Sequence, residues 1–434
     1  MIFLHAFGTR YYLPAPLFLY LIGAGAVVFV SFLLVLPRRV HREESALIDI
    51  APASAGVSWP GWVLGAIACL LVAAGIWGSQ VPGENILPTA FWLVFWVACP
   101  ISIAIIGNYW PYISPLNVIA WTAGRRARTQ YPRSWGFWPA VVLLFVFGSL
   151  ELIFNAFTTL PIVTAFIMVG YAVLTAVMAA MFGAEAWIQR GELFSVLFAT
   201  WGRLGWFRFK SPGRNGFLGG LVHPFEPGPD RLAFVLLMLI SVSFDGLLAT
   251  PAWKSAKLAL PGILKATSAY DALLVIVFVL LGAFIWSLFF SFAAAVRAVG
   301  RLEGSSMAVL AGLLPSLVPI SFGYLLAHNL DYLSINGQLL LPLLSDPTGS
   351  GYLNLFGGAD YEVNKDLLPT VVIWYWEIAL IIAVHVAAVI LAHRYASQKA
   401  RTIVLGRRAE WPWIGAMVSY TMSSLWLLAQ PLVH

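Results

Sequence analysis

The sequence predicts an all-α protein, a polytopic membrane helix bundle with about ten transmembrane helices. Of the 434 residues, 60% are apolar and only 10% are charged, whereas a soluble domain carries roughly 25% charged residues. The apolar residues gather in runs of about 20, the length that an α-helix needs to cross a bilayer. The 19 Trp and 15 Tyr side chains suit the two interfacial belts of such a protein. A lipid bilayer is therefore the expected environment.

Ten apolar runs mark the expected spans in chain order. They lie near residues 14–36, 60–79, 88–107, 137–156, 158–182, 231–252, 267–296, 306–333, 369–396 and 411–432. We expect one integral membrane domain over 1–434, in which 1–210 holds the first five spans and an inner interfacial helix. A Gly/Pro linker at 211–230 precedes the last five spans in 231–434, and an outer loop covers 334–368.

The basic residues predict the orientation of these spans. Most of the 25 Lys and Arg residues fall in alternate connecting segments, and the exceptions are Arg10, Lys254, Lys257, Lys265 and Lys365. The positive-inside rule then places both termini outside, as expected for a multi-pass protein of the bacterial inner (plasma) membrane. Because the net charge of +6 follows this topology, it does not indicate a nucleic-acid partner.

Two expected inner segments differ from simple loops. Residues 108–124 are interrupted by Pro111 and Pro115, so this segment is expected to lie in the interface or to re-enter the membrane. Residues 184–210 mix Trp, Phe and Leu with Arg and Lys, a composition typical of a helix lying flat on the inner leaflet. No P-loop, GxSxG, HExxH or CxxCH motif occurs in the sequence, so no nucleotide, haem or serine-hydrolase chemistry is indicated.

Ionisable side chains inside apolar spans mark the candidate functional site, since such groups are costly in hydrocarbon. Taking each span's centre as the midplane, Glu151 and Glu377 lie about 7 Å above it and Asp245 about 6 Å above it. His328 comes out near 13 Å and Asp331 near 18 Å on the same side. Several carboxylates at one depth cannot all be ionised without partners. The predicted site is thus a polar layer in the outer half of the membrane.

This layer has the composition of a divalent-metal site. Imidazole and carboxylate groups together bind zinc or manganese, and His328, Asp331, Glu377 and Asp245 are the candidate ligands. His5, in the N-terminal segment, would reach the same outer mouth by folding back. Glu377 and Asp245 are also the candidate catalytic carboxylates, one of which would serve as general base. The alternative for each residue is a hydrogen bond that joins two helices of the bundle.

A set of short motifs adds a resemblance to a known family. The motifs are HAFGTRYYLPAPL at the start, SPLN, SFDG, AHNLDYL, SDPTGSGYLNLFG in the outer loop, and HVAAVILAHR near the end. Together they resemble the bacterial multi-pass membrane proteins known as fenitrothion hydrolases, over nearly the whole chain. The resemblance implies hydrolysis of a lipophilic aryl phosphotriester at the membrane, with a second protein subunit as a partner. It assigns no catalytic residues.

Two other classes of function remain open. His385 lies about 4 Å below the midplane, so Glu377 and His385 would serve a transporter as a proton or cation relay. The third and eighth spans are interrupted by Pro100 and Pro315, as inverted-repeat transporters often are. Acidic residues lean to the expected outer side, among them Glu84, Asp346, Asp360, Glu362 and Asp366. Such an acidic outer face would instead suit an integral subunit of a respiratory or metal-handling complex.

Overall fold

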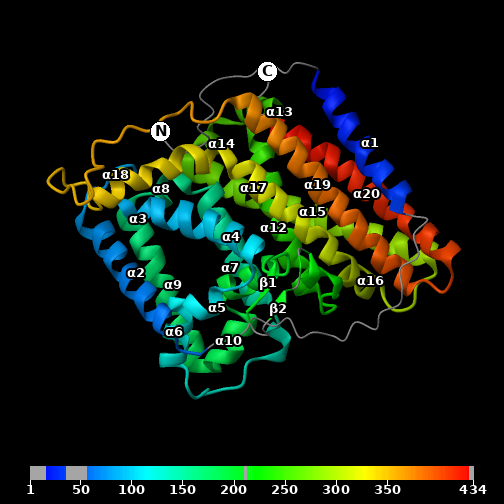
Figure 1. Ribbon diagram of the computed structural model, residues 1–434, viewed down its shortest axis with the longest axis horizontal. Helices are drawn as coiled ribbons and strands as arrows, with labels where there is room; N and C mark the ends of the chain where they lie inside the picture. The colour runs from blue at the N-terminus through cyan, green and yellow to red at the C-terminus, as the bar shows by residue number, and fades with distance from the viewer. Residues whose placement is uncertain (1–15, 36–55, 210–212, 215, 217, 430–434) are drawn as a thin grey trace. The chain divides into compact units, whose positions relative to one another are not determined.

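The computed structural model describes residues 16–35, 56–209, 213, 214, 216 and 218–429 (Figure 1). These residues are helical apart from loops and one antiparallel ladder of β1 (Phe207–Arg208) and β2 (Gly213–Arg214), which confirms the all-α class. In this described part, eight helices are long and apolar enough to cross a membrane. The chain is therefore a multi-pass helical membrane protein. Two expected spans are not among these eight: the fourth, α7 (Trp138–Leu152), is shorter, and the tenth, in α20 (Ile403–Ala429), is not counted as a candidate span. The number of ten therefore stays a prediction.

The helices form two compact units that do not follow the order of the sequence. Among the described residues, unit 1 holds 56–220 and 329–368, and unit 2 holds 16–35, 221–328 and 369–429. The sequence instead predicted two consecutive groups of five spans, divided by the linker at 211–230. Each unit thus combines segments from both groups, and the boundary between the units falls within α17 (Leu317–Asn336).

Unit 1 is built around α2 (Trp59–Trp77) and α9 (Pro161–Phe182), which pack against each other. Its other elements are α3 (Ile86–Pro88), η1 (Thr89–Ala98), α4 (Cys99–Ile106), α5 (Trp110–Ile113), α6 (Pro115–Ala123), η2 (Arg133–Trp135), α7, α8 (Asn155–Thr158), α10 (Ala184–Arg190), α11 (Leu193–Trp201), η5 (Gly337–Leu339) and α18 (Leu340–Ser345), with η3 (Gly219–Val222) at its boundary. Proline in the first turn helps to start α2 and α9, because its missing N–H has no partner there anyway. Gly183 ends α9 with a positive φ of 88°, which glycine adopts readily.

The helix expected to lie flat on the inner leaflet is part of the unit 1 core. Along α11, Leu193, Val196, Leu197 and Phe198 are each at most 2% exposed. A helix on a leaflet surface leaves its polar face to water, and α11 has no such face. Residues 193–201 are therefore buried by the protein itself, and the orientation of this segment relative to the membrane stays a prediction. The segment 108–124 does break as predicted, into α5 and α6 at its two prolines.

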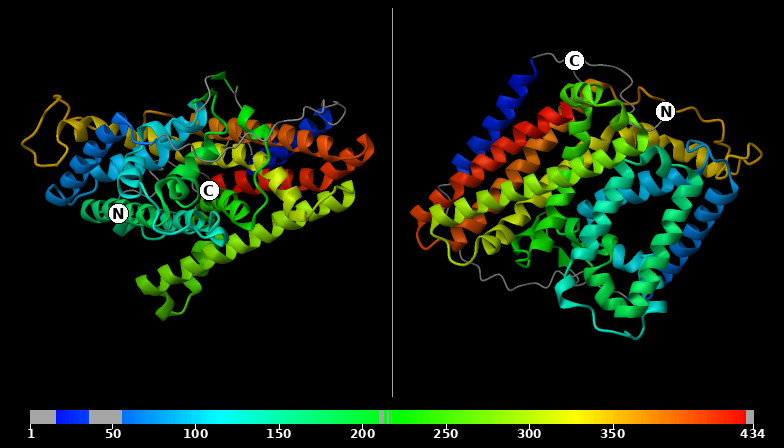
Figure 2. Two further views of the ribbon diagram at one scale, coloured as in Figure 1. Left: turned by 90° about the horizontal axis from the view of Figure 1, so that it is seen from below. Right: turned by 180° about the vertical axis from the view of Figure 1, so that it is seen from behind.

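Unit 2 is a bundle of long helices. They are α1 (Leu17–Val35), α12 (Pro229–Ala249), α13 (Pro251–Ala259), α14 (Gly262–Lys265), α15 (Thr267–Gly300), α16 (Ser306–Leu313), η4 (Leu314–Ser316), the first part of α17, α19 (Thr370–Lys399) and α20 (Ile403–Ala429). Figures 1 and 2 show α1, α20 and α19 side by side, and α15 also packs against α20. This bundle holds most of the ionisable residues singled out by the sequence.

Glycines bring the helices of unit 2 into close contact. A Cβ atom at Gly323 of α17 would lie 2.5 Å from Val384 Cγ2 of α19, and one at Gly246 of α12 would lie 2.9 Å from Leu427 Cβ of α20. Small residues let helix backbones approach closely in membrane bundles. Asp245 directly precedes Gly246 and Tyr324 directly follows Gly323. The close helix contacts at the two glycines therefore also fix the positions of these two polar residues.

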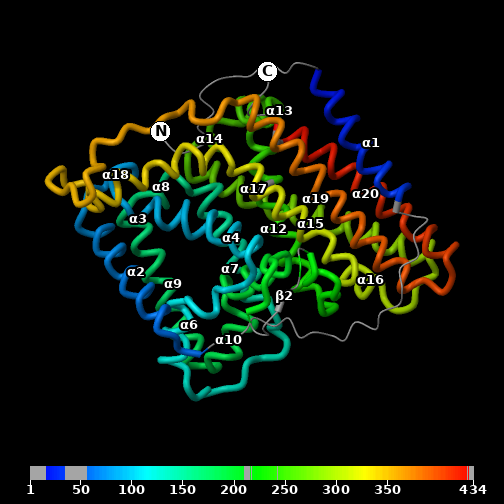
Figure 3. The backbone as a smooth tube through the Cα atoms, in the orientation of Figure 1, coloured from blue at the N-terminus to red at the C-terminus, as the bar shows by residue number. Residues whose placement is uncertain are grey.

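Two of the expected spans contain irregular turns. The third passes through π-helical turns over η1, and the eighth through a single 3₁₀ turn over η4, at Pro315. The helix after this turn continues to Asn336 and is followed by η5 and α18. The loop predicted at 334–368 therefore begins later, after Ser345, and Figure 3 shows it running from α18 to α19.

Candidate functional site

An acid–base pair joins two helices inside unit 2. Asp245 Oδ2 of α12 lies 2.9 Å from His328 Nε2 of α17, and these side chains are 9% and 16% exposed. Both were predicted from the sequence as members of one polar layer, and the structure brings them together. A carboxylate on one imidazole nitrogen orients the ring and fixes its tautomer. The pair is therefore a candidate centre for proton transfer.

A second pair of ionisable side chains lies along α19. Glu377 is 4% exposed and His385 is fully buried, and eight residues separate them by about 12 Å along a helix. His385 Nδ1 lies 2.8 Å from the backbone oxygen of Ile381. Because a carbonyl oxygen only accepts, Nδ1 carries the proton and Nε2 keeps its lone pair. Within the described part of the chain, Nε2 is buried without a hydrogen-bond partner.

Two buried tyrosines lie close to His385. The Tyr420 ring of α20 is centred 6.3 Å from the His385 ring and 6.0 Å from the Tyr324 ring of α17. Ser243 Oγ of α12 lies 3.3 Å from the Tyr420 hydroxyl oxygen. The Tyr324 hydroxyl is buried without a hydrogen-bond partner among the described residues. The sequence reading missed both tyrosines, since tyrosine in a membrane protein is expected at the interface.

These residues form the unit 2 polar cluster, which draws on four helices of one bundle. Its members are Ser243, Asp245, Tyr324, His328, His385 and Tyr420. Glu377 lies on α19 of the same bundle, eight residues before His385. On α17, Tyr324 and His328 are four residues apart and share one helix face. The cluster thus combines carboxylate, imidazole and phenol groups in a mostly apolar bundle, which is an arrangement suited to moving protons.

The other predicted site residues lie elsewhere. Asp331 is on α17 but within unit 1, and Glu151 is near the end of α7 in unit 1; both are partly buried. His5 lies outside the described residues. In the described ranges, no group of three or more His, Cys, Asp or Glu side chains is placed to hold a metal ion. The predicted five-residue ligand set is therefore not assembled by the residues that the structure describes.

A further buried pair in unit 2 was not predicted. His393 Nδ1 of α19 lies 3.0 Å from both carboxylate oxygens of Glu410 of α20, and the two side chains are 4% and 2% exposed. In the sequence, Glu410 directly precedes the expected tenth span at 411–432, so it is not among the ionisable residues expected inside the spans. His393 follows His385 by eight residues, or about 12 Å of helix. This pair therefore fastens α19 to α20 at a point separate from the polar cluster.

Unit 1 contains a buried acid that sequence reasoning also missed. Glu192 is fully buried at the start of α11 and accepts hydrogen bonds from the Tyr171 hydroxyl at 2.5 Å and from the Ser195 N–H at 2.7 Å. The Phe194 N–H also donates to it, at 3.0 Å. Burial raises the pKa of the Glu192 carboxyl group. Its partners are those of a helix N-cap, so Glu192 stabilises the fold of unit 1.

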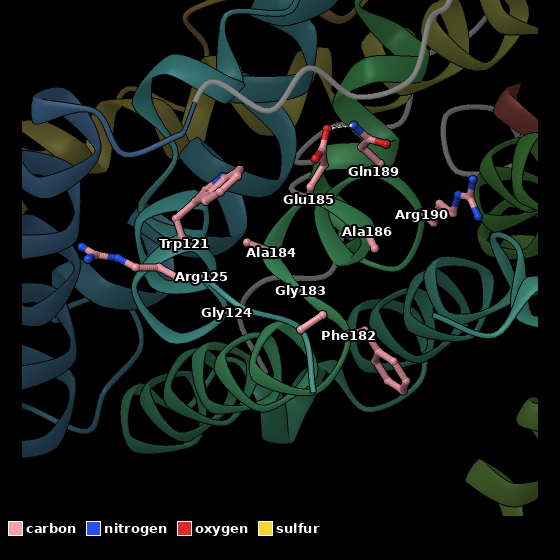
Figure 4. A pocket seen from close by; sticks show the side chains of 11 residues that line it. Trp121, Gly124, Arg125, Phe182, Gly183, Ala184, Glu185, Ala186, Gln189 and Arg190 are labelled. Atoms are coloured by element: carbon pink, nitrogen blue, oxygen red, sulfur yellow. Dashed lines mark hydrogen bonds between the residues drawn. The ribbon is translucent and has the colours of Figure 1, made fainter. Parts of the chain in front are cut away.

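A hollow of about 470 Å³ with two arginines in its lining lies beside α10 in unit 1. Figure 4 shows Arg125 and Arg190 on opposite sides of it, with their guanidinium groups directed away from each other. Glu185 accepts a hydrogen bond from the Gln189 side chain at 3.1 Å. Because the two positive charges do not converge, this hollow does not have the geometry of a phosphate or carboxylate site.

The fold and the cluster define the class of this protein: a polytopic helical membrane protein with ionisable side chains buried inside one helix bundle. No protein-family model matches the chain, and no curated protein and no solved structure matches it.

Proposed function

We propose that this chain is an integral membrane hydrolase whose Asp245–His328 pair supplies the general base. The contact of 2.9 Å between Asp245 Oδ2 and His328 Nε2 carries this proposal. A carboxylate that accepts the imidazole N–H stabilises the imidazolium formed when the ring takes a proton from attacking water. Water then attacks phosphorus, the aryl oxygen leaves as a phenolate, and the transferred proton is returned to solvent.

The resemblance of the sequence motifs to the fenitrothion hydrolases supplies the proposed substrate class, neutral lipophilic aryl phosphotriesters. Such molecules partition into the bilayer, so a site inside a helix bundle would receive them from the lipid. We place this site in the outer half of a bacterial inner membrane, with ten spans and both termini outside. Reporter fusions at the two termini would test that orientation.

The test of the hydrolase is product release from proteoliposomes that contain the purified full-length protein. Fenitrothion is the probe, and the coloured nitrophenol is measured. We expect His328→Gln to lower the rate by about 100-fold or more, the usual share of a general base, and Asp245→Asn to lower it strongly. His393→Gln is the matched control, since it also removes a buried imidazole paired with a carboxylate in unit 2. An unchanged rate in His328→Gln would refute the proposal.

A zinc or manganese ion at this pair is a separate proposal. The chemistry of the donors fits only in part, because a catalytic zinc ion has three protein ligands and the described residues offer two at this point. Proton removal from water by His328, as proposed for the general base, does not require a metal. Elemental analysis of the purified wild type and of His328→Ala tests the ion directly: a stoichiometric metal that disappears in the variant supports it, and a metal-free wild type excludes it.

A proton or cation relay is the second candidate function. It is favoured by the buried Nε2 of His385, which lacks a hydrogen-bond partner among the described residues and lies in the same bundle as Tyr420 and Glu377. Proton flux into proteoliposomes, followed with an internal pH dye, distinguishes the two functions. A relay predicts flux that His385→Ala abolishes, together with no release of nitrophenol. Hydrolysis without proton flux would exclude it.

A further inference from the structure

Unit 1 encloses an apolar cavity of about 420 Å³. Its walls come from α2, η1, α5, α6, α7, α9 and α11, of which α2, α6 and α9 are labelled close together in Figure 1. Small-molecule sites usually have volumes of about 300–1,000 Å³. Every lining side chain is uncharged, so the cavity does not suit an ion. Ile67 and Cys69 of α2 line it and are exposed, which gives the cavity an edge on the apolar surface of unit 1.

Aromatic rings make up much of the wall, namely Phe91, Phe95, Trp110, Phe147, Tyr171 and Phe194. They hold one another in place by edge and tilted contacts, with centroid distances of 4.6 Å for Phe95–Phe194, 5.1 Å for Tyr171–Phe194 and 5.4 Å for Phe147–Tyr171. Ring pairs with centroids 4.5–7 Å apart are favourable. The cavity is therefore a fixed aromatic surface, which suits a planar ring better than a saturated chain.

Trp110 adds one polar feature to this wall. Its side chain is 4% exposed, and its indole Nε1 has no hydrogen-bond partner among the described residues. The ring is fixed by Phe95 at 5.5 Å and by Phe198 at 5.2 Å. A buried donor without a partner is costly, and a ligand that carries an acceptor would remove that cost. The Tyr171 hydroxyl is already engaged with Glu192 and with the Leu193 N–H.

We infer that this cavity binds one neutral, planar aromatic or quinoid molecule with a hydrogen-bond acceptor, which enters from the bilayer. The aromatic wall accepts the ring, and the Trp110 indole N–H donates to a carbonyl or similar oxygen. The inference rests on unit 1 alone and does not depend on the hydrolase proposed for unit 2. A failure of either therefore leaves the other standing.

The experiment measures equilibrium binding of menadione, a naphthoquinone, to the full-length protein in lipid nanodiscs. Gly65 lines the cavity, and a Cβ placed there meets only Pro115 Cβ at 3.7 Å, so Gly65→Leu fills space that the ligand would occupy. We expect this variant to weaken binding at least tenfold. Gly170→Leu is the matched control, because Gly170 is exposed on α9 with nothing within 4 Å of an added Cβ; its affinity should stay within about twofold. Ala172→Leu repeats the filling from α9, in case Gly65→Leu fails to fold.

A second comparison tests the hydrogen bond. Trp110→Phe keeps an aromatic ring but removes the donor, so menadione binding should weaken about fivefold. Binding of 2-methylnaphthalene, which lacks an acceptor, should not change. The inference is overturned if the wild type shows no saturable menadione binding, if Gly170→Leu loses as much affinity as Gly65→Leu, or if free fatty acid displaces menadione at equal concentration. Equal loss for both probes in Trp110→Phe would overturn the role of the indole donor.

Discussion

Replacement of Gly323 by alanine should destabilise unit 2, although alanine favours helices. An added Cβ would lie 2.5 Å from Val384 Cγ2 and 2.8 Å from Cγ1, far inside normal contact distance. Valine is stiff at χ1 in a helix, so the side chain cannot turn away and the two helices must separate. Overpacking of this kind costs about 1–3 kcal/mol, while the propensity gain is about 0.5–1 kcal/mol. We expect a net loss of about 1–2 kcal/mol.

The assay is reversible unfolding of the purified protein in mixed micelles, with Gly415→Ala as the matched control. Gly415 lies in α20 of the same unit, is exposed, and has nothing within 4 Å of an added Cβ, so its replacement should be neutral or slightly stabilising. The double variant Gly323→Ala with Val384→Ala should recover part of the loss, because it removes the γ carbons that clash. If Gly323→Ala proved as stable as Gly415→Ala, the close contact of α17 and α19 would be refuted.

Two further predictions concern unit 1. Glu192→Ala should cost about 1–2 kcal/mol through loss of the α11 N-cap, measured by unfolding, while Glu185→Ala, which removes only an exposed contact, should change little. Burial raises the pKa of the Glu192 carboxyl group. This group therefore contributes to the stability of the folded state at low pH, and its contribution is lost as pH rises through the raised pKa. If the stability of Glu192→Ala kept this pH dependence, Glu192 would not be its source. Asp346→Ala should speed proteolysis of the loop after α18, since Asp346 accepts the Gly351 N–H at 2.7 Å. Burial raises the pKa of Asp346, but its hydrogen bonds outweigh this and hold that pKa below its usual value, so wild-type protection should be present at neutral pH and lost as pH falls through the lowered pKa. Equal cleavage of the wild type and of Asp346→Ala at neutral pH would refute the role of Asp346 in holding this loop.

The long helices could be predicted closely from apolar runs alone. The expected spans 267–296 and 369–396 compare with α15 (Thr267–Gly300) and α19 (Thr370–Lys399). What the runs could not show is which helices pack together. Sequence order suggested consecutive groups of five spans, whereas α1 packs with α19 and α20. The sequence carries no signal for this pairing, because any apolar helix face in a membrane can pack on another.

The polar layer was predicted in composition but not in geometry. The depth estimate separated Asp245 from His328 by about 7 Å along the membrane normal, yet their atoms lie 2.9 Å apart. That estimate assumed straight, upright helices, while real spans tilt and the helix bearing His328 follows an irregular turn at Pro315. The partner of His393 was missed for a different reason: Glu410 lies inside α20, which begins eight residues before the expected span at 411–432.

The packing of α1 has a consequence for how the protein is made. Val28 and Phe32 of α1 are fully buried, and the helix packs on α19 and α20, which a ribosome synthesises more than 300 residues later. The first helix must therefore wait in the lipid, or against an insertion factor, while most of the chain is translated. Truncation before α19 would leave this early helix without its permanent neighbours, and the stalled product should be a target for membrane proteases.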